Sequence, residues 1–294
     1  MSDTPRPRRS VLYMPGSNAR ALEKAKTLAA DALILDLEDA VAPDQKEMAR
    51  EQVRDTVLAG GYGARELIIR INGLATEWGS EDLMAALAAR PDAVLVPKVN
   101  SPDDVHAVAR ALSASDIETV AIWAMIETPA AILDIAAIAA TADEAGVPLA
   151  AFVMGTNDLA KETGARLVPG RAPFLAWLSM ALIAARAHGI AVIDGVYNDF
   201  RNAEGFEDEC RQGRDLGMDG KTLIHPGQID TANAVFAPAE DEVAWARRII
   251  AAFEEPEHKG KGAITIDGRM VELLHAEMAA KTVAIAEAIA AREG

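Results

Sequence analysis

The fold prediction rests first on one stretch of ten residues, Val120-Ala121-Ile122-Trp123-Ala124-Met125-Ile126-Glu127-Thr128-Pro129. Its first seven residues form an uninterrupted apolar run, which is typical of a strand covered on both faces of a parallel sheet. Thr128 and Pro129 then supply an N-cap hydroxyl followed by proline at the first helical position. The stretch therefore predicts a strand that ends at Glu127 and passes directly into a helix.

The same alternation of a short apolar run and a segment of helical period recurs along the chain. Residues 102–112, for example, place Val105, Val108, Ala109 and Leu112 on one face, as expected of a helix that packs on a sheet. The runs of strand type are Ser10–Met14, Ala32–Asp36, Glu66–Ile71, Ala93–Pro97, Val120–Ile126, Ala150–Met154, Ala191–Asp194 and Lys221–Ile224. Eight βα units in about 230 residues predict a closed (β/α)8 barrel, or TIM barrel, with a doubly wound open sheet as the alternative.

The chain continues beyond the predicted barrel domain, which we place at residues 1–254. A polar stretch from Glu254 to Gly262 precedes a short apolar run at 264–266, an Asp267-Gly268 turn and an Ala-rich helix. Residues 255–294 are therefore predicted to form a C-terminal helical appendage that serves as a lid or an oligomer contact. The alternative is that these residues are structural padding with no direct role in function.

Composition restricts the possible partners. The formal net charge of −16 and the pI near 4.8 argue against nucleic acid and anionic membranes as partners. No apolar run approaches the roughly 18 residues of a membrane span, and residues 1–9 lack the apolar core of a signal peptide. The single cysteine, Cys210, cannot form an intrachain disulfide. We therefore expect a cytoplasmic protein.

Charged side chains follow the predicted strands, at the edge where barrel enzymes place their active sites. Glu127 follows the fifth apolar run and Asp158 follows the sixth, so their carboxylates are expected to be neighbours. Two carboxylates without a nearby cysteine or histidine favour a hard cation such as Mg2+. A general acid–base pair that works without metal is the competing interpretation.

Two basic residues are expected at the same mouth. Arg70 could bind a substrate carboxylate or stabilise an enolate oxygen, and an ion pair with Asp36, Glu38 or Asp39 is the alternative. Lys98 is a candidate Schiff-base lysine, but the surrounding carboxylates would raise its pKa and so disfavour the neutral amine.

A basic segment follows the first predicted strand. It reads Pro15-Gly16-Ser17-Asn18-Ala19-Arg20, with Lys24 further along. A phosphate-bearing ligand could use the N-terminus of the next helix together with Arg20 and Lys24, whereas a solvated helix face is the simpler interpretation.

Several familiar motifs are absent from the sequence. Gly220-Lys221-Thr222 resembles the end of a P-loop, but Asp215 stands where the first glycine belongs. We find no HExxH or GxSxG motif, no dinucleotide fingerprint after a strand and no histidines with zinc-site spacing. The sequence therefore does not support ATP, NAD or zinc chemistry.

Seven motifs occur in order along nearly the whole chain: Arg9-Ser10-x-Leu12-Tyr13-x-Pro15-Gly16-Ser17, Leu35-Asp36-Leu37-Glu38-Asp39-Ala40-Val41, Ile69-Arg70-Ile71-Asn72, Pro97-Lys98, Ile126-Glu127-Thr128, Gly155-x-Asn157-Asp158-Leu159 and Gly220-Lys221-x-x-Ile224-His225-Pro226. Together they resemble the HpcH/HpaI aldolase/citrate lyase family, in its citrate lyase β-subunit-like branch. That branch includes malyl-CoA and citramalyl-CoA lyases and malyl-CoA thioesterases.

The resemblance implies a (β/α)8 barrel that assembles as a homotrimer or a dimer of trimers. It implies Mg2+, for which Mn2+ can substitute, held by Glu127 and Asp158, with coenzyme A as part of the substrate. It also implies that Arg70 binds the substrate carboxylate beside the acidic pair Glu38 and Asp39. The residues that it places near the coenzyme A phosphates are Pro15, Ser17, Asn18, Arg20 and Lys24.

The resemblance also gives the C-terminal appendage a role. In the lyases of this branch it closes over a neighbouring subunit's site and delivers an acid–base carboxylate, typically the Asp of a Gly-x-Met-(Ile/Val)-Asp stretch. The matching stretch here is Gly268-Arg269-Met270-Val271-Glu272, so Glu272 replaces the aspartate. The longer side chain shifts the carboxylate by about an ångström, which is enough to affect a near-attack geometry. Asp267 is the nearby alternative.

Three functions follow as expectations. The first is a Mg2+-dependent lyase that reversibly cleaves a 3-hydroxy-3-carboxyacyl-CoA such as malyl-CoA to a 2-oxo acid and acetyl-CoA. The second is a malyl-CoA thioesterase, which would use the same ligands. The third is a citrate lyase β-like subunit that requires partners, against which the intact set of Glu127, Asp158 and Arg70 argues.

Overall fold

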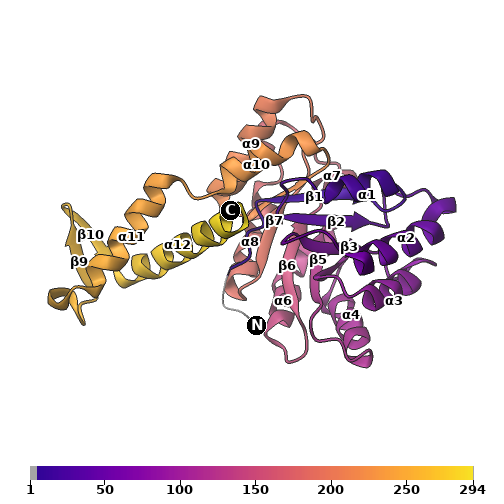
Figure 1. The fold of residues 1–294 in the computed structure, drawn as a ribbon, viewed down its shortest axis with the longest axis horizontal. Coiled ribbons are helices and arrows are strands. Elements are labelled where there is room, and N and C mark those ends of the chain that lie inside the picture. Colours follow the sequence, from indigo (N-terminus) through magenta and orange to yellow (C-terminus); the bar gives the residue numbers. More distant parts are fainter. Residues whose placement is uncertain (1–4, 294) are drawn as a thin grey trace. The chain divides into compact units, whose positions relative to one another are not determined.

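Eight parallel strands pair in sequence order and close into a barrel in the computed structural model, which describes residues 5–293 (Figure 1). The strands are β1 (Ser10–Pro15), β2 (Ala32–Asp36), β3 (Glu66–Arg70), β4 (Ala93–Val96), β5 (Ala121–Ile126), β6 (Leu149–Met154), β7 (Ala191–Asp194) and β8 (Gly220–Leu223). The barrel closes where β8 pairs with β1, which places Thr222 opposite Val11. Each predicted strand occurs within one residue of its expected ends. The predicted (β/α)8 barrel is therefore confirmed, and the open sheet is wrong.

Alternate residues of the strands point into the barrel and fill it with apolar side chains. Trp123 and Leu95 are completely buried there, and the cluster consists of Val11, Ala32, Ile34, Ile68, Ala93, Leu95, Trp123, Met125, Ala151, Val153 and Ile193. The strand period of two residues sends every second side chain inward, and the others meet the helices outside. The barrel interior is therefore a packed core that leaves no room for a ligand between the strands.

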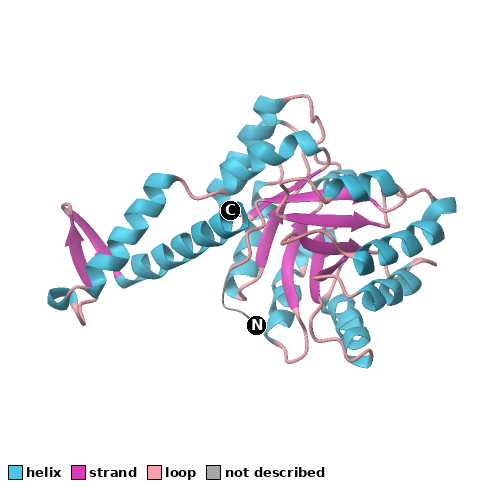
Figure 2. Cartoon of the chain, in the orientation of Figure 1, coloured by secondary structure: helices cyan, strands magenta, loops and turns pink. Residues whose placement is uncertain are grey.

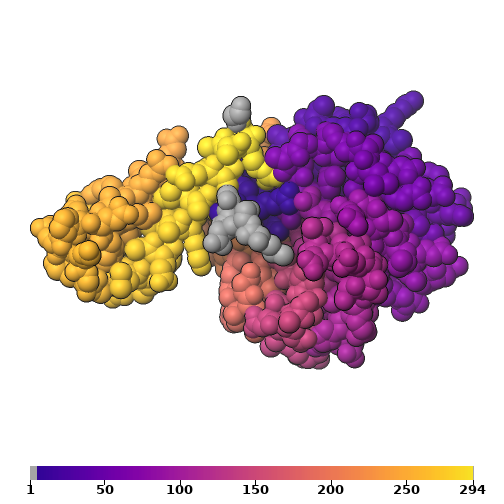
Figure 3. All heavy atoms as spheres, turned by 60° about the horizontal axis from the view of Figure 1, so that its bottom comes forward, coloured from indigo at the N-terminus to yellow at the C-terminus, as the bar shows by residue number. Residues whose placement is uncertain are grey.

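Helices follow the strands and surround the barrel (Figure 2). They are α1 (Ala19–Ala25), α2 (Lys46–Ala59), α3 (Gly79–Ala89), α4 (Pro102–Ala114), α5 (Pro129–Leu133), α6 (Ile135–Ala140), α7 (Thr156–Thr163), α8 (Leu175–Ala187), α9 (Ala203–Leu216) and α10 (Ile229–Phe236). In the space-filling view of Figure 3 the N-terminal half of this layer, indigo to magenta, forms a continuous packed surface. None of the helices within residues 5–293 is long and apolar enough to cross a membrane.

The predicted helix starts are correct. The Thr128 hydroxyl accepts a hydrogen bond from the Ala131 backbone N–H at 3.1 Å, and Pro129 is the first residue of α5. At α4 the Asp104 carboxylate accepts from the Ser101 N–H at 3.1 Å, and Pro102 begins the helix. Both caps bind N–H groups that have no partner inside the helix.

Residues 8–234 form one compact unit, and residues 5–7 with 235–293 form a second. The second unit contains α11 (Glu240–Glu254), the antiparallel hairpin β9 (Ala263–Ile266) and β10 (Arg269–Glu272), and α12 (Leu273–Glu293). Its own apolar cluster consists of Ala246, Ile249, Ile264, Val271 and Ala279. Within this unit α11 packs along α12. The unit therefore includes residues from 235 onward and begins before the expected domain boundary at 254/255. A lid or oligomer contact for residues 255–294, of which 294 lies outside the described residues, stays a prediction.

We expect the barrel interior to dominate stability. Leu95→Ala removes a fully buried side chain from β4 and should lower the free energy of unfolding by about 2–5 kcal/mol. Leu133→Ala on α5 is the matched control, since Leu133 is 85% exposed and its truncation should change stability by less than about 0.5 kcal/mol. Urea unfolding measures both values. Equal losses would contradict the assignment of the core.

Candidate functional site

The carboxyl ends of the strands surround a pocket of about 300 Å3. Its walls come from the top of the barrel and from the loops after β2, β6, β7 and β8. The lining residues are Tyr13, Asp36, Asp39, Ala40, Arg70, Met125, Met154, Gly155, Thr156, Asn157, Asp158, Val196, Asn198, Thr222 and Ile224. The predicted residues Arg70, Asp39 and Asp158 therefore lie on one cavity, at the end of the barrel where the sequence placed them.

Arg70 is buried in a shell of carboxylates. Its Nε and Nη2 donate to the two oxygens of Asp36, each at 2.6 Å, in a bidentate pair. Its Nη1 lies 2.6 Å from Glu38 Oε2 and 3.2 Å from Asp39 Oδ2. The ring of Tyr13 packs against the guanidinium at 4.9 Å. The ion pairs that the sequence offered as the alternative for Arg70 are thus all present, and Arg70 also lines the pocket.

Asp36 organises the turn that presents the acidic pair. Besides binding Arg70, its carboxylate accepts hydrogen bonds from the N–H groups of Glu38 at 2.9 Å and Ala40 at 3.1 Å. The side chain is 1% exposed, so these contacts replace water completely. Sequence analysis counted Asp36 only as a partner for Arg70, although a carboxylate at the very end of a buried strand was a signal for more.

Glu127 and Asp158 meet at the ammonium group of Lys98. Glu127 Oε1 accepts a hydrogen bond from the Lys98 backbone N–H at 2.8 Å and lies 3.5 Å from Nζ. The same Nζ donates to Asp158 Oδ1. Lys98 has a φ of 54°, which is uncommon for a residue with a side chain and indicates a locally constrained backbone. The predicted neighbourhood of the two carboxylates is therefore present, with a cation between them.

The surroundings of this pair fit a hard divalent cation. The donors are carboxylate oxygens, and Glu127 is 1% exposed, so its charge needs a nearby positive partner. Gly155 makes room for the Glu127 side chain, because a Cβ at position 155 would lie 2.2 Å from Glu127 Cβ and 2.7 Å from Glu127 Oε2. Burial raises the pKa of Glu127, and Asp158 adds to the shift while Lys98 opposes it.

Two ionisable side chains at the strand ends, Glu38 and Tyr13, have raised pKa values. Burial raises the pKa of Glu38 to about 8, with Arg70 opposing this shift and Asp39 adding to it. Burial also raises the pKa of Tyr13, so its phenol stays protonated and can donate a hydrogen bond. Glu38 is thus a carboxyl that can exchange a proton near neutral pH.

Lys98 does not fit a Schiff-base role. Burial lowers its pKa, but the hydrogen bond to Asp158 and the charge of Glu127 outweigh that effect and raise the pKa above its usual value. A lysine that attacks a carbonyl must be neutral. The predicted effect of the acidic neighbours on the pKa of Lys98 is therefore confirmed in direction.

Two asparagines that sequence analysis did not select also border the pocket. Asn157 Nδ2 donates to Asn198 Oδ1 at 3.1 Å, and Asn198 Nδ2 donates to Asn157 Oδ1 at 2.7 Å. This reciprocal amide pair joins the loops after β6 and β7. The motif around Asn157 was visible in the sequence, but its partner lies 41 residues away, so no local signal could identify it.

The basic segment after β1 is partly structural. Gly16 is needed because a Cβ there would lie 2.6 Å from the Asp36 carbonyl oxygen. Asn18 caps α1 by accepting from the Ala21 N–H at 3.1 Å. Arg20 and Lys24 are exposed on α1. Contact of Pro15, Ser17, Asn18, Arg20 and Lys24 with a phosphate stays a prediction.

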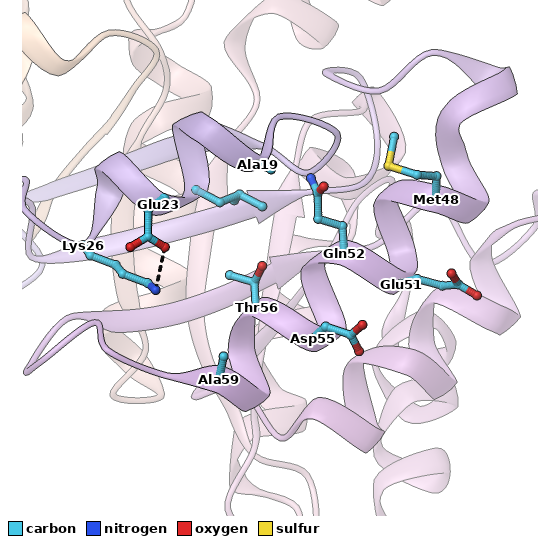
Figure 4. A pocket seen from close by; sticks show the side chains of 10 residues that line it. Ala19, Glu23, Lys26, Met48, Glu51, Gln52, Asp55, Thr56 and Ala59 are labelled. Carbon is cyan, nitrogen blue, oxygen red and sulfur yellow. Dashed lines mark ion pairs between the residues drawn. The ribbon is translucent and has the colours of Figure 1, made fainter.

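A larger hollow of about 530 Å3 lies between α1 and α2, outside the barrel (Figure 4). Its ionisable lining is mainly acidic, with Glu23, Glu51 and Asp55, and Lys26 is paired with Glu23 at 2.7 Å. None of the strand-end carboxylates line it. The negative charge of this lining would repel a phosphate, and the lining contains none of the strand-end side chains expected to act in catalysis.

The fragment that resembles a P-loop is part of a buried ion network. Lys221 is completely buried and donates to Asp194 at 2.9 Å and to Glu209 at 2.7 Å. Arg171 completes the network through Asp194. Nearby Cys210 is buried, and burial raises the pKa of its thiol to about 12. Both Lys221 and Cys210 are therefore structural residues.

The two candidate lid carboxylates lie in the second unit. Asp267 has a φ of 50° in the turn of the hairpin β9–β10 and pairs with Arg248. Glu272 ends β10, and its backbone N–H donates to His275 Nδ1 at 2.9 Å. The Glu272 carboxylate makes no ion pair within residues 5–293. Of the two side chains, Glu272 is the one not held by a local cation.

A second set of potential metal ligands also belongs to this unit. One ligand atom each from Glu255, Glu257 and His258 lies within 4.8 Å of the others. The two glutamates are exposed, and His258 Nδ1 already bonds to the Ala252 carbonyl at 2.7 Å. This set lacks the buried neighbours that characterise the Glu127 site.

Comparisons with known proteins agree with this geometry. A model of the HpcH/HpaI aldolase/citrate lyase family matches residues 9–226. The chain is 52% identical to a (3S)-malyl-CoA thioesterase of Cereibacter sphaeroides, over 99% of both chains. It is 36% identical to an L-malyl-CoA/beta-methylmalyl-CoA lyase of the same species, over 97% of this chain and 96% of the relative. The crystal structure of protein CitE from Mycobacterium tuberculosis with magnesium, acetoacetate and coenzyme A is 31% identical, with a TM-score of 0.73, covering 93% of this chain and 97% of that one.

We expect Glu38→Gln to change how stability depends on pH. The folded protein keeps the Glu38 proton up to a pKa of about 8, whereas the ordinary value is 4.5. Between about pH 5 and about pH 9 the wild type should therefore lose roughly 2–4 kcal/mol relative to the variant, because deprotonation is costly only in the folded state.

Urea unfolding in EDTA at the two pH values measures this difference. Glu47→Gln, which changes an exposed carboxyl on α2, is the matched control. If wild type and Glu38→Gln followed the same pH dependence, the raised pKa of Glu38 would be refuted.

Proposed function

Because the chain belongs to the HpcH/HpaI aldolase/citrate lyase family, we propose that it is a CoA-ester enzyme that hydrolyses the thioester of malyl-CoA or a close analogue. The products would be the free 2-hydroxydicarboxylic acid and coenzyme A. Family membership, together with the full-length similarity to a malyl-CoA thioesterase and a malyl-CoA lyase, makes the chain an enzyme of the CoA-ester lyase and thioesterase group. The choice between the two reactions is the proposal.

The observation that carries this choice is the 52% identity to the (3S)-malyl-CoA thioesterase over 99% of both chains. The similarity to the malyl-CoA lyase is lower, at 36%, although it also spans nearly the whole chain. Glu272 in place of the lyases' usual aspartate points in the same direction. The order of the first two expectations from the sequence is therefore reversed.

We propose that Glu127 and Asp158 hold Mg2+, for which Mn2+ can substitute. Support comes from their carboxylate donors and from the magnesium in the crystal structure of the related CitE. When bound, the ion would supply a Lewis acid for the hydroxyl and carboxylate oxygens of the acyl group. Lys98 would then act as a neighbouring cation that balances the two carboxylates.

The chain's own residues would bind and orient the acyl group. Arg70 would bind its carboxylate from the floor of the pocket, because its position is set by Asp36 and its charge is permanent. The Tyr13 hydroxyl would donate a hydrogen bond to a substrate oxygen. The negative charge of Asp39 would disfavour an anionic ligand that binds without a compensating cation.

Hydrolysis requires two proton transfers. Water adds to the thioester carbon while a carboxylate takes its proton, and the carbon–sulfur bond then breaks as the sulfur leaves and is protonated. Within the barrel unit Glu38 is the candidate for these transfers, since its pKa of about 8 suits both directions near neutral pH. Glu272 is the candidate in the C-terminal unit.

Carbon–carbon cleavage of malyl-CoA is the second candidate function. The similarity to the lyase favours it, and Arg70, Glu127 and Asp158 could serve either reaction. A citrate lyase β-like subunit that depends on partners is the third. We further propose that the chain forms a homotrimer or a dimer of trimers, which sedimentation analysis would test. Residues 255–294 would form its lid.

We expect the purified chain to release free thiol and malate from malyl-CoA in the presence of Mg2+, without an equivalent of glyoxylate. EDTA should lower the rate by at least about 100-fold, because the carboxylate pair would lose the cation that binds the acyl group. A thiol reagent and an aldehyde trap, used in parallel, measure the two products. Stoichiometric glyoxylate would instead identify the lyase, and complete inactivity without other subunits would identify the partner-dependent form.

We expect Glu272→Ala to lower kcat by about 100-fold or more, as for the loss of a general acid–base group. Asp267→Ala is the matched control on the same hairpin and should retain activity within a few-fold, because Asp267 is already paired with Arg248. Steady-state kinetics of both variants decide the assignment. Loss of activity in Asp267→Ala alone would transfer the role to Asp267.

A further inference from the structure

Two exposed rings stack beside the pocket. Phe200 follows β7 and His225 follows β8, and their ring centroids are 4.9 Å apart at an interplanar angle of 12°. Phe200 is 47% exposed, and the guanidinium of Arg201 lies 5.8 Å from its ring. The two loops therefore combine a flat aromatic surface with a cation at the surface of the barrel unit.

A buried glutamine holds the two loops together. Gln228 is 3% exposed, and its Oε1 accepts from the N–H groups of Ile224 at 3.0 Å and His225 at 3.1 Å. Its Nε2 donates to the Tyr197 carbonyl at 3.2 Å, on the loop that carries Phe200. The two loops that carry the rings are thus joined by hydrogen bonds before any ligand arrives, which lowers the entropic cost of binding.

His225 has a local structural role that does not explain Phe200. Its Nδ1 accepts a hydrogen bond from the Gly227 N–H at 3.0 Å and so caps the turn after β8. A serine or aspartate could form such a cap without a ring. The Phe200 side chain has no polar atom with which to form such a cap, and nearly half of its surface is accessible to a ligand. The stack of Phe200 and His225 therefore offers a flat surface to a ligand with its own flat face.

The stack lies next to the proposed substrate pocket. Asn198, two residues before Phe200, and Ile224, one residue before His225, both line that pocket. Since β8 pairs with β1, the loop with His225 follows the strand adjacent to the one that precedes Arg20 and Lys24. A CoA ester with its acyl group in the pocket would extend its nucleotide end over this rim.

From this juxtaposition we propose that Phe200 and His225 form the platform on which the adenine base of the CoA ester stacks, with Arg201 beside the phosphates. The inference rests on the proposed function for the identity of the ligand. Base–aromatic stacking needs only a π face, and cationic guanidinium groups suit phosphate oxygens. Phe200, His225 and Arg201 would thus contribute to affinity for the nucleotide part and leave the chemistry of the acyl group unchanged.

Binding of adenosine 3′,5′-bisphosphate to the full chain, measured by titration calorimetry, tests the platform without any catalysis. Phe200→Ala should weaken this binding by about 5- to 100-fold, as expected for loss of one stacking partner. Phe200→Trp keeps a larger ring and should bind at least as well as wild type. Leu133→Ala, which truncates another exposed hydrophobic residue, is the control and should change nothing.

Kinetics with two substrates separate this inference from the proposed function. Phe200→Ala should raise KM for malyl-CoA at unchanged kcat and leave KM for malyl-pantetheine, which lacks the nucleotide, at the wild-type value. Bisphosphate binding that is absent in wild type, or unchanged in Phe200→Ala with an intact fold by circular dichroism, overturns the platform. If binding depends on Phe200 but no CoA ester is turned over, the platform stands and the proposed function fails.

Discussion

Closure of the parallel sheet is the constraint from which the rest of the molecule follows. Pairing of β8 with β1 brings the carboxyl ends of all eight strands to one rim, because every strand runs in the same direction. Arg70 and Asp36 are 34 residues apart in sequence, and Lys98 and Asp158 are 60 apart, yet both pairs are in contact at this rim. The interior below the rim is packed, so a ligand of the barrel has to bind at the rim.

The rim contains more negative than positive charge. Arg70 is shared by three carboxylates, and Lys98 is shared by Glu127 and Asp158. Buried carboxylates are costly unless they are paired or protonated, and the pKa of Glu38 is raised by its burial and further by the neighbouring carboxylates, which Arg70 opposes only in part. The same imbalance makes the pocket suitable for a divalent cation, which would supply the missing positive charge. An acidic protein can therefore accept an anionic substrate, provided that a cation accompanies it.

In the proposed function, the barrel would bind the acyl group of the substrate and the loops would bind its nucleotide end. The floor of the pocket, with Arg70 and Tyr13, belongs to the strands of the barrel itself. The loops after β7 and β8 are joined by Gln228 and present Phe200 and His225. In our proposal these loops would bind the nucleotide end of a CoA ester with groups that take no part in the reaction.

The sequence by itself determined the eight strands to within one residue, the helix starts at Ser101 and Thr128, and the charged residue types at the strand ends. These features depend on local periodicity and capping, which neighbouring residues specify. Only the tertiary structure decided the partners: Asp36 for Arg70, Lys98 between Glu127 and Asp158, and His225 for Phe200. It also decided that α11 packs with α12. Such pairings join residues far apart in the chain, and no local pattern encodes which of several like charges or rings barrel closure and packing bring into contact.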